Sequence, residues 1–296
     1  MLRLLRSELF RLVRRWMPWV LLGMVVLLSF VLYELIWVTS NAQLALLRAG
    51  TAPATPNAPP PDVQIRALEQ AIQTLRPARL TELGAGFVQG FGAIVVIVFS
   101  ASHVGTEWAW GTLRTVLAAG AGRIPFLVSK YLTLVGFAIV YTVVGLAAAL
   151  AASYLVSSQA GLDTTGLDLG TVAQAGARAI YGFLPYIALT ALIAGWFRSA
   201  GGGIAAGLVI FFSESIVVSL LVSLNKDLVT IANLGLSRNV QAISRIPGVA
   251  VTGNGPQGAL STLPDQGQAG IVLAAWTAIF VGLAVWRLRT RDITLA

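Results

Sequence analysis

The chain contains no cysteine and very little else that could bind a metal ion. Without cysteine there is no disulfide, no thiolate metal site and no thiol redox chemistry, and the cellular compartment cannot be inferred from cysteine usage. His103 is the only histidine, so a two-histidine metal site is excluded. The three methionines, at positions 1, 17 and 24, also argue against a soft-metal pathway. We expect neither a metal site nor a catalytic triad.

Charged residues are also scarce. They make up 11% of the chain, against 56% hydrophobic residues and a mean hydropathy of +0.80. Values of this kind lie far outside the range of soluble domains and indicate an integral membrane protein. With 296 residues, the chain has room for about six helical spans of roughly 20 residues each. We therefore predict an all-α membrane protein in which residues 1–296 form one transmembrane domain, with no separate soluble catalytic domain.

A nucleotide-binding loop is missing as well. No segment reads GxxxxGK[ST], and the glycines at 201–203 lead into an apolar run instead of following a strand. The net charge of +8 could indicate nucleic acid, but the basic residues flank apolar runs instead of forming one polar surface. We expect no ATP site in this chain and no nucleic-acid partner; the basic residues are signals of membrane topology.

Six apolar runs are expected to cross the membrane. The first is too long for a signal peptide and lacks an A-x-A cleavage site, so we expect it to be retained. Segments on one side carry a net charge of about +9 and those on the other about +1. The positive-inside rule then predicts a multi-pass protein of the bacterial plasma membrane with both termini cytoplasmic. The predicted spans are residues 16–38, 87–104, 126–156, 179–197, 201–224 and 270–288.

Residues 1–15 combine five arginines with leucines and valine. This composition is typical of a helix that lies in the headgroup layer and leads into the first span. The alternative is a basic flank without structure of its own.

Two large segments are predicted on the outer face, residues 39–83 and 225–267. The first contains the proline-rich spacer 51–61 and then a short helix in which Ile65, Leu68, Ile72 and Leu75 share one face, which we expect to pack on the bundle or the membrane surface. The second contains a predicted short helix at 236–246. Either segment could bind an extracytoplasmic partner.

Polar residues inside or beside the spans are candidates for a pathway or gate. Glu214 lies near the middle of the fifth span, where a carboxylate is costly and usually faces a cavity or a partner; alternatively, it is a structural group bonded to Ser213 and Ser215. His103 and Glu107 are four residues apart and could pair as a gate or as a simple anchor. Glu34 is a weaker candidate, since it can reach the headgroups.

Glycine pairs with GxxxG spacing occur at Gly86 and Gly90 and at Gly203 and Gly207. This spacing lets helices approach closely. It fits packing within one subunit as well as dimerisation.

Residues 107–123, between the second and third spans, form a basic, glycine-punctuated segment that is expected on the inner side. Together with Lys130, the segment resembles the corresponding region of the permease subunits of type-2 ABC exporters. In that family a Glu ends span two, and a GTLR-like turn, a coupling helix, a basic residue and a Lys that opens span three follow. The matching residues are Glu107, Gly111, Thr112, Leu113, Arg114, Arg123 and Lys130.

The resemblance extends over the whole chain, from a basic N-terminus with Glu8 to an ending with Arg291 and Asp292. It implies that this chain pairs with a second, identical or related permease, and that separate ATPase subunits dock on its inner coupling helix. ATP and Mg would be bound by those partners, so the chain would be part of an ATP-hydrolysing exporter without being catalytic itself. One departure is the AAGAG sequence at 118–122, where such permeases often have a proline-containing turn.

Three hypotheses follow from these observations. The first is the membrane subunit of an ABC exporter. The second is a secondary transporter that uses Glu214 for proton coupling, although no internal repeat supports it. The third is an ABC-type mechanical or signalling subunit that binds an extracytoplasmic partner. None of them identifies what is transported.

Overall fold

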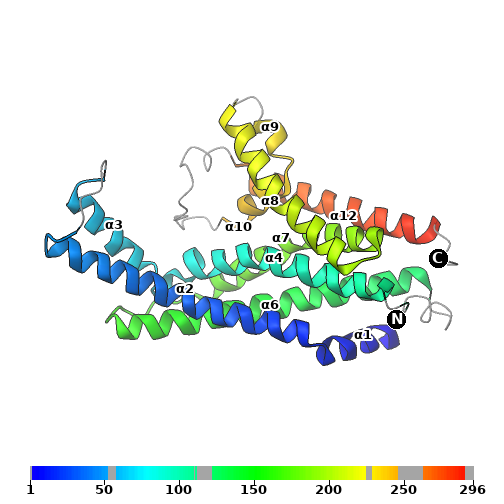
Figure 1. Ribbon diagram of the computed structural model, residues 1–296, viewed down its shortest axis with the longest axis horizontal. Coiled ribbons are helices and arrows are strands. Elements are labelled where there is room, and N and C mark those ends of the chain that lie inside the picture. The colour runs from blue at the N-terminus through cyan, green and yellow to red at the C-terminus, as the bar shows by residue number, and fades with distance from the viewer. Residues whose placement is uncertain are drawn as a thin grey trace.

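The structure is a computed structural model that describes residues 2–52, 58–109, 111, 122–224, 229–245 and 263–290. Within these residues every regular element is a helix and no strand is present. Six helices are long and apolar enough to cross a membrane. The predicted all-α, multi-pass membrane protein is therefore confirmed (Figure 1).

The six helices are mostly longer than the apolar runs that predicted them. They are α2 (Trp16–Arg48), α4 (Leu80–Ala109), α6 (Arg123–Gln159), α7 (Leu169–Phe197), α8 (Ala200–Leu224) and α12 (Gln266–Thr290). The largest differences at a single helix end are ten residues: α2 ends ten residues after its predicted span, and α7 begins ten residues before its own. Asp168 caps this helix by accepting a hydrogen bond of 2.8 Å from the backbone N–H of Gly170, so the polar first turns are helical too.

The centre of the bundle is formed by α4, α6 and α7, with α2 against α6, α8 against α4 and α7, and α12 against α7. Aromatic side chains fill this centre. The rings of Phe99 and Phe137 stack at 3.8 Å between centroids, and Tyr141 meets Phe183 edge to face. The outer helices leave much of their apolar surface exposed, as helices that face lipid do.

One of the two GxxxG pairs is used for packing within the chain. A Cβ at Gly203 would lie 2.6 Å from the Cβ of Ala194 in α7, and a Cβ at Gly207 would lie 2.9 Å from Ile97 in α4. These glycines let α8 approach both helices closely. Gly86 and Gly90 differ, since nothing lies within 4 Å of a Cβ built on either.

The helices α2 and α6 extend well past the other helices at one end, which we call the far end (Figure 1). At 33 and 37 residues they measure about 50 and 55 Å, more than the ~30 Å hydrocarbon core. Helix α3 (Pro61–Gln73) and the short η1 (Pro77–Arg79) lie here, and α3 packs against α2. Between them, Leu75 is fully buried among Tyr33, Ala149 and Ala152. The predicted packing of this outer helix on the bundle is thus present.

Two short helices follow α8, namely α9 (Val229–Ala232) and α10 (Leu236–Ser244). The predicted helix at 236–246 corresponds to α10 and ends two residues earlier. It packs against α12, α7 and α8. Leu236 and Asn239 of α10 are buried in these contacts.

The opposite end of the bundle, which we call the basic end, carries α1 (Leu2–Arg14). Arg15 has an extended backbone that separates α1 from α2, so the two helices are distinct. Helix α1 packs mainly against α6, and it lies beside the ends of α4 and α6 in Figure 1. The ends of these three helices bring together the polar residues described next.

Candidate functional site

A group of ionisable side chains is buried where α1, α4 and α6 meet at the basic end. We call it the ionic cluster; its members are Glu8 and Arg11 of α1, His103 and Glu107 of α4, and Lys130 of α6. Glu8, His103, Glu107 and Lys130 are each no more than 3% exposed. Charged residues are almost never buried this fully unless they are paired.

Lys130 is the centre of the ionic cluster. Its Nζ lies 2.5 Å from Oε2 of Glu8 and donates to Oε1 of Glu107 at 2.8 Å. Arg11 adds a second cation, with Nη1 3.4 Å from Oε1 of Glu107 and 3.6 Å from Oε1 of Glu8. Arg15 is a third, with Nη2 4.0 Å from Oε1 of Glu107. The two buried carboxylates are thus both paired with cations.

Helix periodicity explains how the sequence builds this arrangement. His103 and Glu107 are one turn apart on α4, and Glu8 and Arg11 are three residues apart on α1, so each pair lies on one helix face. Lys130 projects from the second turn of α6 between them. Its contacts with Glu8 and Glu107 join residues that are 122 and 23 positions apart in the sequence.

Glu8 is strongly acidic in this environment. Burial by itself raises the pKa of the carboxyl group, but His103 and Lys130 favour the charged form more strongly, and together they lower the pKa from 4.5 to about 2. Glu8 is therefore ionised at neutral pH. The attraction between α1 and α6 depends on this charge.

The predicted pairing of His103 with Glu107 is not present. The Nε2 atom of His103 lies 3.3 Å from Oε2 of Glu8 instead, and its ring stacks on Phe99. Spacing within α4 could show that His103 and Glu107 share a face. The partners come from other helices, however: Glu8 of α1 pairs with His103, and Lys130 of α6 pairs with Glu107. The observed contacts agree better with the anchoring role for His103 than with a gate.

The remaining residues of the predicted coupling segment lie in different places. Arg123 donates to the backbone carbonyls of Leu288 at 3.0 Å and Arg289 at 3.1 Å, where α12 ends. A cation at a helix C-terminus satisfies its last carbonyl groups and opposes the negative end of the helix dipole. Gly111 has a φ of +68°, which suits glycine. Thr112 and Arg114 lie outside the described residues.

The three predicted pathway residues do not form one site. His103 belongs to the ionic cluster, while Glu34 accepts a hydrogen bond from Gln159 at 3.4 Å at the far end. Oε1 of Glu214 accepts a bond of 2.8 Å from the backbone N–H of Ser237. The carboxylate of Glu214 thus caps the N-terminus of α10. The hydroxyl groups of Ser213 and Ser215 donate to the carbonyls of Ile210 and Phe211, one turn earlier in α8.

A cavity of about 300 Å³ lies between α4, α7, α8 and α10. Gly86 and Gly90 line it, which explains why no atoms lie close to these glycines. Its polar lining includes Gln89, which donates to the carbonyl of Val240 at 3.3 Å and to the hydroxyl of Ser244. This cavity has the size of a small-molecule site.

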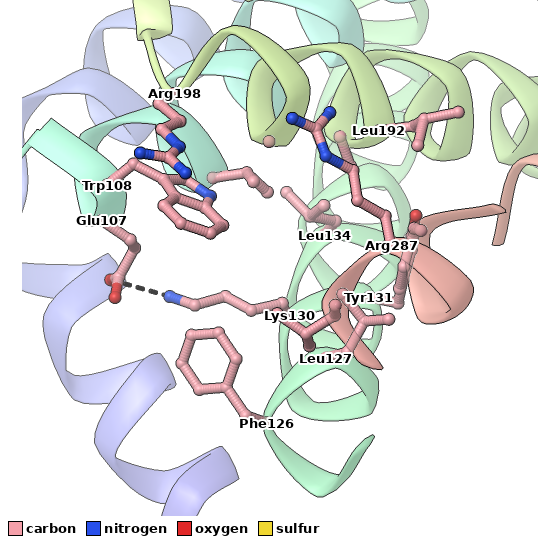
Figure 2. A pocket seen from close by; sticks show the side chains of 15 residues that line it. Glu107, Trp108, Phe126, Leu127, Lys130, Tyr131, Leu134, Leu192, Arg198 and Arg287 are labelled. Atoms are coloured by element: carbon pink, nitrogen blue, oxygen red, sulfur yellow. Dashed lines mark hydrogen bonds and ion pairs between the residues drawn. The ribbon is translucent and has the colours of Figure 1, made fainter. Parts of the chain in front are cut away.

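A second, smaller cavity lies at the basic end, beside the ionic cluster (Figure 2). Helices α4, α6, α7 and α12 line it, and its volume is about 70 Å³. Glu107 and Lys130 form part of one wall, and Arg198 and Arg287 stand on another side (Figure 2).

Sequence reasoning missed three residues of this region as site residues. Glu8 is the only acidic residue in an arginine-rich helix, and that contrast was the signal available for it. Arg198 follows the end of α7, and its left-handed backbone, with φ of +52°, appears only in the structure. Gly105 gave no signal, although a Cβ there would lie 2.4 Å from the backbone nitrogen of Ala200.

The fold and the ionic cluster define an α-helical, multi-pass membrane protein with a buried charge network at one end of its bundle. The chain belongs to the protein family described as "Protein of unknown function (DUF2705)", which it matches over residues 85–294. This range includes most of α4 and the helices from α6 to α12, but not α1 to α3. No curated protein and no solved structure matches the chain.

Proposed function

We propose that this protein is the membrane subunit of an ATP-binding cassette exporter of the bacterial plasma membrane, powered by separate ATPase subunits that bind at its basic end. The observation that carries the proposal is the position of the ionic cluster. Glu107 and Lys130 bracket residues 108–129 and hold the two ends of that segment together across 2.8 Å. A movement of this segment would act on α4 and α6 at once.

The contacts around the segment extend this connection to other helices. Glu8 links Lys130 to α1, and Arg123 links the start of α6 to the end of α12. In our proposal α1 is the interfacial elbow helix and residues 107–123 are the coupling segment. Force applied by a docked ATPase would reach four helices through ionic and hydrogen-bonded contacts. Packed interfaces with such contacts switch between two discrete arrangements instead of deforming continuously.

The pathway in this proposal involves the cavity of about 300 Å³ between α4, α7, α8 and α10. A second copy of the chain, or a related permease, would complete it. The sequence supplies no phosphate-binding loop, so ATP and Mg would be bound by the partner subunits. The chain would therefore have no catalytic activity of its own.

A proton-coupled secondary transporter receives less support. Its key residue, Glu214, has one carboxylate oxygen bonded to the start of α10, a position that explains the acidic residue without transport. A mechanical or signalling subunit would use the same contacts at the basic end. It differs in having an extracytoplasmic partner, for which the far end with α3 is the available surface.

The proposal is tested first by copurification and then by ATP hydrolysis. We expect the tagged full-length chain to be recovered with an ATPase subunit, whose activity in liposomes depends on the chain. The double variant Glu107→Gln/Lys130→Met removes both charges of one contact without changing the net charge. Because coupling between sites is commonly worth 5- to 150-fold, we expect it to reduce chain-dependent ATP hydrolysis about fivefold or more.

The control is Arg48→Gln/Glu69→Gln, which removes an ion pair of 2.9 Å at the far end with the same charge balance. Both double variants must still copurify with the ATPase and keep a cooperative melting transition. Recovery of the chain without any ATPase, together with transport driven by a proton gradient, would overturn the proposal. Equal hydrolysis in the two variants would remove the coupling role from the ionic cluster.

A further inference from the structure

The small cavity at the basic end lies between the end of α4, the first turns of α6 and the last turns of α7 and α12 (Figure 2). We call it the basic crevice. Its lining is mainly apolar and includes Trp108, Tyr131, Leu134 and Leu192.

The charge of the basic crevice is positive. Arg198, Arg287 and Lys130 contribute three cations, and Glu107 is the one carboxylate in its lining. Glu107 is engaged by Lys130 and Arg11 in the ionic cluster. The guanidinium groups of Arg198 and Arg287 lie on the same side of the crevice in Figure 2. An anion placed there would meet two positive groups.

Both guanidinium groups are held against tryptophan rings. Arg198 lies over Trp108 at 5.5 Å from the ring centroid, and Arg287 lies over Trp196 at 4.1 Å. Arg287 also donates to the backbone carbonyl of Trp196 at 2.9 Å. Tryptophan is typical of the membrane interface, where its amphipathic ring sits at the level of the headgroups. The two cations are thus positioned at the depth of lipid phosphates.

Arg198 has two features that a turn residue does not need. Its φ of +52° makes it the one non-glycine residue with a positive φ among the described residues. A left-handed conformation costs an ordinary side chain about 1 kcal/mol, which glycine would avoid. Within the same part of the chain, no carboxylate forms an ion pair with this exposed guanidinium. Arg198 thus combines a strained backbone with a guanidinium group that lines a cavity and has no carboxylate partner among the described residues. Strain that is kept at such a position points to a ligand.

We propose that the basic crevice binds an anionic phospholipid, with the phosphate against Arg198 and Arg287 and one acyl chain along the apolar lining. A volume of about 70 Å³ is too small for a drug-sized soluble ligand, which needs roughly 300 Å³ or more. A lipid needs less enclosed space, because most of it remains in the bilayer. Basic pockets between transmembrane helices are known to take acidic headgroups. This inference does not depend on the ATPase proposal.

The test is native mass spectrometry of the purified full-length protein in detergent, titrated with phosphatidylglycerol or with phosphatidylcholine of the same acyl chains. We expect tighter binding of phosphatidylglycerol. Arg198→Asn removes the cation but keeps a residue that tolerates the left-handed conformation. We expect it to weaken phosphatidylglycerol binding about tenfold, the value of one charge-assisted contact, without lowering the melting temperature in lipid-free detergent.

The matched pair Arg287→Gln and Arg289→Gln separates this site from general charge, since Arg289 is exposed on the same helix and does not line the crevice. Only Arg287→Gln should weaken phosphatidylglycerol binding. Equal binding of the two lipids, or unchanged binding in Arg198→Asn, overturns the proposal. Competition by soluble glycerol 3-phosphate at the same affinity would also overturn it, because the ligand would then be a free anion.

Discussion

Glu8 is a buried carboxylate in a helix that is otherwise rich in leucine and arginine. Three other ionisable side chains lie within hydrogen-bond or ion-pair distance of it, namely His103, Lys130 and Arg11. Of these, His103 and Lys130 lower its pKa. Breaking one partner of a buried ion pair usually costs about 3–5 kcal/mol, since the other charge is left uncompensated. The contacts of Glu8 are thus important for stability.

The pKa of Glu8 leads to a prediction about stability in acid. Its folded-state pKa of about 2 lies below the ordinary 4.5, so its stabilising contribution is present above pH 4.5 and is lost as the pH falls toward 2. The full contribution is at most about 3 kcal/mol. We expect the melting temperature of the purified protein to fall between pH 4.5 and 3, and Glu8→Gln to be less stable at pH 7 and less sensitive to pH.

The control for this measurement is Glu69→Gln at the far end, whose carboxylate is exposed. It should leave both the stability at pH 7 and the slope in acid close to those of the unsubstituted protein. If Glu8→Gln and Glu69→Gln had the same pH profile, the acidity assigned to Glu8 would be wrong.

At the scale of elements, α4 lies in the centre of the bundle with α6 and α7, and small residues determine how closely its neighbours approach it. Gly105 faces the turn between α7 and α8, where backbone atoms of Ser199 and Ala200 are the nearest neighbours. Gly203 and Gly207 of α8 likewise allow this helix to approach α7 and α4 closely. Close packing of backbones therefore replaces the hydrophobic effect, which does not drive helices together within lipid.

This packing predicts opposite effects for two glycine substitutions in α4. In Gly105→Ala the new Cβ would lie 2.4 Å from a backbone nitrogen and 2.5 Å from a Cα, both of Ala200. The backbone cannot yield easily, so we expect a destabilisation of about 1–3 kcal/mol, as for other overpacked sites. In Gly90→Ala the Cβ meets nothing within 4 Å, and the gain in helix propensity should stabilise the protein by up to about 1 kcal/mol.

Thermal unfolding of both variants in the same detergent compares the two effects. A Gly105→Ala variant as stable as Gly90→Ala would show that α7, α8 and α4 are not packed as described.

At the scale of the whole molecule, charge and length are distributed unevenly between the two ends. The basic end carries α1, Arg123, Arg198 and Arg287. The far end carries α3 on the extensions of α2 and α6 (Figure 1). The proposed ATPase contact and the lipid site both lie at the basic end. They remain separable, because one depends on the ionic cluster and the other on Arg198.

Orientation in the membrane is a prediction that the absence of cysteine makes simple to test. Gln70 of α3 and Thr290 at the end of α12 are both exposed, and each can be replaced by a single cysteine. With the basic end in the cytoplasm, a membrane-impermeant maleimide should label Gln70→Cys in spheroplasts and Thr290→Cys only after permeabilisation. The reverse pattern would contradict the predicted orientation, and the parent chain without cysteine is the control.

The class of the fold followed from the sequence. Six apolar runs without cysteine, and with few charges, left no solution except a helical bundle in a membrane, because backbone groups in lipid must be satisfied within each helix. The helices at 61–73 and 236–244 were also predictable, since their apolar residues recur at helical spacing. Helix ends were less predictable. A span predicted from hydropathy ends at the first polar residues. The helix itself continues as long as its backbone hydrogen bonds are made, up to a cap such as Asp168.

The sequence by itself determined the number of spans, the excess of positive charge beside some of them and the candidates Glu107, Arg123 and Lys130. Only the tertiary structure decided which side chains meet. Local spacing placed His103 and Glu107 on one face of α4, but α1 supplies Glu8 as the partner of His103 and α6 supplies Lys130 as the partner of Glu107. Glu214 caps α10, a helix that begins 22 residues later in the chain. Periodicity describes one helix at a time, and a buried charge takes its partner from whichever helix packs beside it.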